Sequence, residues 1–107
     1  MVQYREFYRI AIDRTGRLQC GAETLPCHVV DLTEKGFQLQ VEKSFAIGDL
    51  LQLEFPLTER EVLACAVEVK YARPPFLGVV IVSISSDHYA LLSRFIHEVN
   101  TISLMGF

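Results

Sequence analysis

The sequence predicts an all-β fold, an antiparallel barrel or closed sandwich of roughly six strands followed by one helix. Two observations lead to this prediction. Short apolar runs with period-two alternation are separated by turn residues about every eight to twelve positions. After Ile84 the apolar spacing changes to three and four residues, which is the period of a helix.

Composition predicts one domain with a substantial core. The chain has 107 residues, of which 50% are hydrophobic and 21% are charged. A domain of this length buries roughly 65% of its unfolded surface, so disorder is not expected. The net charge of −3 argues against general binding to nucleic acids or anionic membranes, although it allows a small basic site.

The first elements are an arm and two short strands. Residues 1–9 are aromatic and charged without strand alternation. Residues 10–12 lead into a predicted turn at 13–16, and residues 17–20 alternate as a short strand. A second turn is predicted at residues 21–24.

A hairpin is predicted in the segment HVVDLTEKGFQLQ, whose two apolar runs flank a polar turn. Alternation places Val30 and Leu32 on the core face and Asp31 and Thr33 on the opposite face. Gly36 ends the turn at a position that often needs positive φ. Asp31 and Thr33 could instead cap the backbone N–H groups of the turn, and the segment alone leaves that alternative open.

Three further strands are predicted after a loop at residues 42–49. They cover residues 50–55, 62–71 and 77–84, and the last is expected to be fully buried because it is dense in β-branched residues. The prolines at 74–75 end the second of these strands. The residues predicted to face the core are Leu51, Leu53, Phe55, Leu63, Cys65, Val67 and Val69.

An amphipathic helix is predicted at residues 86–100, with Ser85 or Ser86 as its cap and Asp87 in its first turn. Its apolar stripe is read as core material. The stripe consists of Tyr89, Leu92, Phe95, Ile96 and Val99. The apolar tail at residues 101–107 could dock on the domain, dock on a neighbouring subunit or stay disordered.

Cysteine and histidine spacing predicts no metal site. Cys20, Cys27 and Cys65 are odd in number and lack CxxC spacing, so buried reduced thiols are expected. The three histidines form no ligand cluster with them. No stretch approaches the roughly 18 apolar residues that a membrane helix requires, and we expect a cytoplasmic protein.

Two arginines in the arm, Arg5 and Arg9, share one side whether the segment is helical or extended. Taken alone they could be a solvated surface. In order along the chain, however, RxxxR followed by Asp31-x-Thr33-x-x-Gly36 resembles the PilZ family, whose hallmark is RxxxR upstream of [D/N]xSxxG. Weaker agreement is found at residues 47–49, 77–81 and 91–96.

The resemblance implies a six-stranded antiparallel PilZ-like barrel, residues 10–85, that binds the bacterial second messenger cyclic di-GMP. By position, Arg5 and Arg9 would hold phosphate and the guanine edge. Asp31 and Thr33 would hold the base, and Gly36 would keep the turn unobstructed. Arginine's planar donor fork suits phosphate and guanine, and a carboxylate accepts from guanine's N–H donors.

The sequence departs from the family pattern at two positions. Thr33 replaces serine, so the hydroxyl is kept while a methyl group restricts χ1. Tyr4 stands where many members have another arginine, a position that influences whether one ligand or two bind. We therefore expect one ligand per site.

The leading hypothesis is a cyclic di-GMP receptor whose arm, residues 1–9, orders over the ligand and passes the signal to an unidentified effector protein. Motility, pili, biofilm or exopolysaccharide synthesis would be the controlled processes. We expect a monomer or weak homodimer without cofactor, nucleic-acid or membrane partner. The alternative is a nucleotide-independent PilZ-type adaptor that contacts its partner through the apolar tail or Phe76. An enzyme is not expected, because no nucleophile–base pair or phosphate-binding glycine loop is recognisable.

Overall fold

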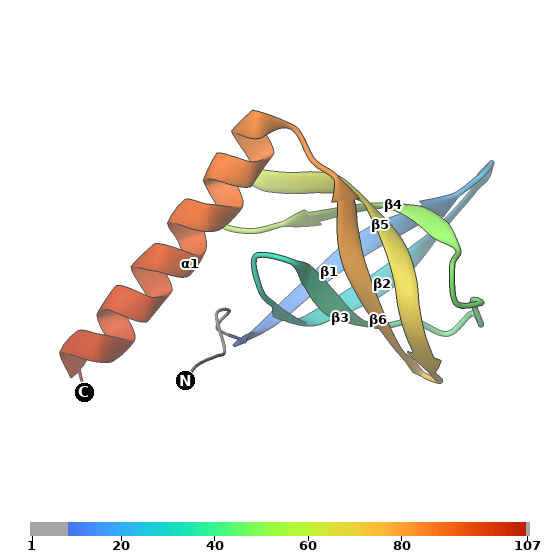
Figure 1. Ribbon diagram of the computed structural model, residues 1–107, viewed down its shortest axis with the longest axis horizontal. Coiled ribbons are helices and arrows are strands. Elements are labelled where there is room, and N and C mark those ends of the chain that lie inside the picture. Colours follow the sequence, from blue (N-terminus) through green and yellow to red (C-terminus); the bar gives the residue numbers. More distant parts are fainter. Residues whose placement is uncertain (1–8, 107) are drawn as a thin grey trace, which may run out of the picture.

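Six antiparallel strands form a closed barrel, and one helix follows them (Figure 1). The computed structural model describes residues 9–106, with side chains described through residue 99. Around the barrel the strand order is β1-β2-β3-β6-β5-β4. The elements are β1 (Ile10–Cys20), β2 (Glu23–Leu32), β3 (Gly36–Gln40), β4 (Leu50–Pro56), β5 (Val62–Arg73), β6 (Phe76–Ser83) and α1 (Ser86–Gly106).

The core is filled by the alternating inward faces of the strands, as the sequence predicts for β4 and β5. The seven residues predicted to face inward there are all buried, and Phe37 meets Phe55 edge to face with ring centroids 5.5 Å apart. Polar or charged residues are absent from the buried set among the described residues. Burial of this apolar surface is the main force that closes the barrel.

The predicted turn at residues 13–16 is wrong, because β1 continues through it as one strand. A register shift between Ala11 and Arg14 marks a β-bulge that bends the strand. Gly16 lies beside β4, next to the Arg17–Glu54 pair, and a Cβ there would come within 2.6 Å of the Glu54 carbonyl oxygen and 2.7 Å of Phe55 Cβ. The glycine is therefore needed for close approach of two strands and not for a turn.

The predicted β2–β3 hairpin is present, but its inward face differs from the prediction. Val29 and Leu32 are fully buried, whereas Val30 is half-buried. The cause is a register shift between Val29 and Asp31, where β2 carries one extra residue opposite β3. A bulge of this kind breaks strict alternation, so inward positions are three apart instead of two.

Strand β6 is less buried than predicted. Leu77 and Val79 are buried, but exposure increases along the strand and Val82 is 49% exposed. The buried part of β6 pairs with β3, and the exposed part lies beyond the end of that pairing. A β-branched run alone therefore overestimated how much of the strand is covered.

Helix α1 is capped by Ser85, as predicted, whose Oγ accepts from His88 N–H at 3.1 Å. Leu92 and Ile96 are buried against the barrel, whereas Tyr89, predicted to lie in the core, is 44% exposed. The helix runs to Gly106, past the predicted boundary at residue 100, so helix replaces most of the predicted tail. Its C-terminal end projects away from the strands (Figure 1).

All three cysteines are free, with Cys27 and Cys65 buried and Cys20 partly buried. Burial raises the pKa of the Cys27 thiol to about 11 and that of Cys65 to about 12.

Within residues 9–106 no group of three potential metal ligands is found. In the same part of the chain, no helix has the length and apolar character needed to cross a membrane.

Candidate functional site

The residue before β1, the end of β2 and the start of β3 meet the last part of β5 and the middle of β6 around a cavity of about 230 Å³. Four of the five residues predicted to bind a ligand line this cavity: Arg9, Asp31, Thr33 and Gly36. Arg5, the fifth, lies outside the described residues. Segments far apart in the sequence therefore converge on one place, which the closed strand order brings about. The other lining residues are Lys35, Phe37, Gln38, Lys70, Tyr71, Gly78, Val79 and Val80.

Arg9 and Asp31 face each other across the first two strands. Arg9 Nε lies 4.0 Å from Asp31 Oδ2. The Asp31 side chain is 17% exposed and that of Arg9 is 74% exposed, so the carboxylate is largely covered in the wall while the guanidinium extends into solvent. An ion pair at this distance with one exposed partner contributes about 0–1 kcal/mol, so an anionic ligand can compete for the guanidinium.

Thr33 organises the turn between β2 and β3. Its Oγ1 accepts from Lys35 N–H at 3.0 Å and from Gly36 N–H at 3.2 Å. Its own N–H donates to the Gly36 carbonyl at 2.9 Å. The capping alternative therefore applies to Thr33. Among the described residues, Asp31 makes no such bond to the turn and instead faces Arg9.

Gly36 does not have positive φ, contrary to the prediction; among the described glycines, Gly21 and Gly48 do. A Cβ at Gly36 would come 2.1 Å from the Val79 carbonyl oxygen and 2.9 Å from Val80 Cα. The glycine is required because β3 approaches the backbone of β6 too closely for any side chain. This close approach brings the turn and β6 together in the wall of the cavity.

Tyr71 is a site residue that the sequence analysis did not select. It pairs with Gly78 across β5 and β6, and a Cβ on Gly78 would lie 2.0 Å from Tyr71 Cε2. The ring therefore lies directly over the glycine, and 45% of the residue remains exposed. Strict alternation assigns Tyr71 to the core, but a register shift between Val69 and Tyr71 turns it outward. An aromatic residue opposite a glycine was the available signal.

The cavity is a locally basic place in an acidic chain. Arg9, Lys35 and Lys70 line it, against the single carboxylate of Asp31. Lys70 Nζ lies 3.6 Å from Glu68 Oε2, in a contact that is half-exposed and weak. Three cations, one carboxylate and one exposed aromatic face suit a planar base that carries phosphate groups.

These features define a class of protein: a small closed antiparallel barrel with a basic cavity on its outer surface. The family model described as "PilZ domain" matches residues 3–98, and the chain belongs to this family. The matched range spans every strand of the barrel. Comparison with curated proteins gives no match.

Solved structures have the same fold. The Bacillus subtilis inhibitor of motility (MotI/DgrA) has a TM-score of 0.77 at 15% identity; the alignment covers 92% of this chain and 52% of that one. The chain thus spans about half the length of that protein. The PilZ domain with c-di-GMP of YcgR from Escherichia coli has a TM-score of 0.74 at 16% identity, covering 92% and 93%. The PilZ domain of CeSA from a cellulose-synthesizing bacterium has a TM-score of 0.70 at 10% identity, covering 87% and 98%.

Proposed function

We propose that this chain is a cyclic di-GMP receptor that binds the nucleotide at the cavity lined by Arg9 and Asp31, which we call the nucleotide cavity, and passes the signal to a partner protein. The observation that carries the proposal is the pairing of a largely covered carboxylate with an exposed guanidinium in a basic cavity. Membership of the PilZ family and the c-di-GMP in the YcgR structure support it. The residues are suited to binding and not to chemistry, so we propose an adaptor and not an enzyme.

The cavity size determines which part of the ligand it holds. At about 230 Å³ it is below the range of roughly 300–1,000 Å³ that encloses a drug-sized ligand. One guanine base would sit in the cavity, flat on the ring of Tyr71. The phosphates would lie at the rim, where Arg9 and Lys70 can reach them.

Asp31 would select guanine over adenine. A carboxylate only accepts hydrogen bonds, and guanine offers N–H donors where adenine has an acceptor nitrogen.

Thr33 would contribute mainly to the shape of the turn. Two backbone N–H groups already donate to its hydroxyl oxygen, and the hydroxyl itself donates to the Gly36 carbonyl at 3.5 Å. Thr33 therefore keeps the turn in shape, and its O–H would reach a ligand oxygen only by giving up this long bond to Gly36.

The arm would complete the site. We propose that Arg5 binds the second phosphate or base edge from residues 1–8, which precede the first described residue. Two guanidiniums match the two negative charges of the ligand. Ordering of the arm by the ligand would create the surface that a partner protein recognises.

Isothermal titration of cyclic di-GMP into the full chain tests the proposal. We expect binding in the wild type and at least about a tenfold loss of affinity, or 1.4 kcal/mol, in R5A, R9A and D31A. R60A and E59A change exposed charges in the β4–β5 turn and should bind like the wild type. Cyclic di-AMP should bind at least about tenfold more weakly, because the Asp31 contact depends on guanine. Absence of binding, or equal affinity in D31A, would contradict the proposal.

A further inference from the structure

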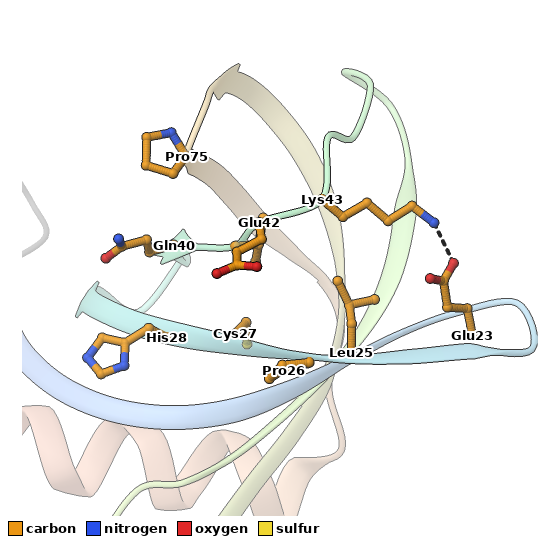
Figure 2. Close-up of a pocket in the computed structure, with 10 residues that line it drawn as sticks. Glu23, Leu25, Pro26, Cys27, His28, Gln40, Glu42, Lys43 and Pro75 are labelled. Carbon is orange, nitrogen blue, oxygen red and sulfur yellow. Dashed lines mark hydrogen bonds and ion pairs between the residues drawn. The ribbon is translucent and has the colours of Figure 1, made fainter.

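A second and larger hollow lies at the other end of β3. Its volume is about 630 Å³, within the range typical of binding pockets. We call it the β2 notch; its lining residues are Glu23, Leu25, Pro26, Cys27, His28, Gln40, Val41, Glu42, Lys43 and Pro75. Figure 2 shows the β2 residues along one wall, and Glu42 and Lys43 along the other.

The β2 notch exists because β3 is shorter than its neighbour. β2 pairs with β1 from Glu23 to Leu32, but within residues 9–106 its pairing with β3 begins only at His28. Beyond Gln40 the chain turns away, and Val41 N–H donates to the Pro75 carbonyl at 2.9 Å. The first half of β2 therefore has a strand neighbour on one side only.

The pairing register determines which backbone groups point into the notch. Cys20 and Glu23 close a two-residue hairpin, so they exchange hydrogen bonds across β1 and β2. Alternation then turns the backbone groups of Thr24 and Pro26 away from β1, to the open edge of β2, and of these two residues Pro26 lines the notch. Proline has no N–H, so this edge offers two carbonyls and one N–H. An added β-strand would lack a donor at Pro26, which disfavours strand addition.

Charge and burial in the notch point to a cationic group with an apolar stem. Glu23 pairs with Lys43 at the outer end, which leaves Glu42 without an ion-pair partner among the described residues. Cys27 and Val41 are buried in the lining, each 5% exposed, and Leu25 packs against the core. The raised pKa of Cys27 has burial as its main cause, opposed by a hydrogen bond with the Gly16 backbone.

We propose that the β2 notch binds an arginine side chain presented by an extended segment of a partner protein. A guanidinium carries five donors and no acceptor, which complements an edge rich in carbonyls and a carboxylate at Glu42. Its methylene stem would lie on the apolar lining while its head stays near solvent. Lysine has fewer donors and no planar fork, so it fits this edge less well. The site is separate from the nucleotide cavity and does not depend on the proposed function.

The probe is a blocked leucine–arginine–leucine tripeptide, titrated into the ¹⁵N-labelled full chain and followed by amide chemical shifts. We expect saturable shifts at Thr24, Cys27 and Glu42, with a dissociation constant of about 1 mM. The same peptide with citrulline keeps the shape and removes the charge, and it should bind about tenfold more weakly.

Two variants complete the test. E42Q removes one carboxylate charge from an exposed loop and should weaken binding about threefold to tenfold. E59Q makes the same change in the β4–β5 turn and should have no effect. The inference is overturned if the shifts are absent at 10 times that concentration, if they fall in the nucleotide cavity instead, if citrulline binds equally well, or if E42Q binds like E59Q.

Discussion

Two hollows lie at opposite ends of the same strand, and their charges are opposite. Gly36, the first residue of β3, lines the nucleotide cavity, and Gln40, the last, lines the β2 notch. The cavity carries three cations against one carboxylate, whereas the notch carries two carboxylates, Glu23 and Glu42, against one ammonium. A five-residue strand between longer neighbours thus leaves hollows at both ends, and the flanking side chains decide what each can bind.

The largest effect is expected for G36A, which would disturb both hollows at once. A methyl group at this position must displace the backbone of β6, and we expect the free energy of unfolding to decrease by about 3 kcal/mol. G21A is the matched control, since nothing lies within 4 Å of its Cβ and only its positive φ is strained, which costs about 1 kcal/mol. Urea denaturation measures both, and equal losses would show that the β3–β6 approach is not tight.

The next effect concerns the thiol in the lining of the notch. With a pKa raised from 9.0 to about 11, Cys27 has about a hundredfold less thiolate at pH 8 than an ordinary thiol. Iodoacetamide should therefore modify partly buried Cys20 first and leave Cys27 and Cys65 unmodified in the folded chain, as read by mass spectrometry. Fast modification of Cys27 would contradict this prediction and would mean that the reagent can enter the notch and reach the Cys27 thiol.

The pKa values of the buried Cys27 and Cys65 thiols are both raised by folding. The stability that these thiols contribute is therefore present below pH 9 and is lost as the pH rises towards 11 and 12.

A smaller effect is expected from the aromatic surface in the nucleotide cavity. Y71A removes the ring over Gly78 and should weaken cyclic di-GMP binding by about 1–3 kcal/mol, the usual contribution of stacking one base on an aromatic ring. Y71F keeps the ring and should bind like the wild type in the same titration. The arginine peptide should bind Y71A unchanged, because Tyr71 does not line the notch. Loss of both ligands would show that the two hollows are not independent.

The smallest effect is expected at the contact between helix α1 and the β2–β3 turn. Tyr89 Oη lies 3.4 Å from Glu34 Oε1; Tyr89 is exposed and Glu34 is half-buried. Y89F should change the free energy of unfolding by less than about 0.5 kcal/mol and leave both hollows intact. A larger change in thermal or urea denaturation would mean that the helix fixes the turn next to the nucleotide cavity.

The sequence predicted those elements in which one physical rule applies without interruption. Burial alternates strictly along β4 and along β5 as far as Val69, and Leu53 and Val67 are buried as expected. Bulges defeated the prediction elsewhere, because one extra residue reverses which side chains face the core. Val30 in β2 and Tyr71 in β5 both lie at such shifts.

A glycine can mark a turn or a close approach of two strands, and the sequence alone does not distinguish these roles. Gly16 and Gly36 looked like turn residues, but both serve the close approach of strands that lie 38 or more residues apart in the chain. Such pairings are set by the closed barrel and have no local signal. The motif residues Arg9, Asp31, Thr33 and Gly36 were found from the resemblance, whereas Lys70 and Tyr71 required the register of β5 against β6.

The β3–β6 pairing has a consequence for how ligand binding would reach the rest of the barrel. Like the β1–β4 pairing, it joins strands that are not consecutive in the chain, and it connects residues 36–40 to residues 76–80. A nucleotide that contacts Asp31 in β2 and Tyr71 in β5 would link the two strands that flank the β3–β6 pair. Bound at 100 times its dissociation constant, it would stabilise the closed barrel by about 2.7 kcal/mol. Amide hydrogen exchange should then slow most in β3 and β6. Binding at a surface cavity would in this way make opening of the whole barrel less frequent.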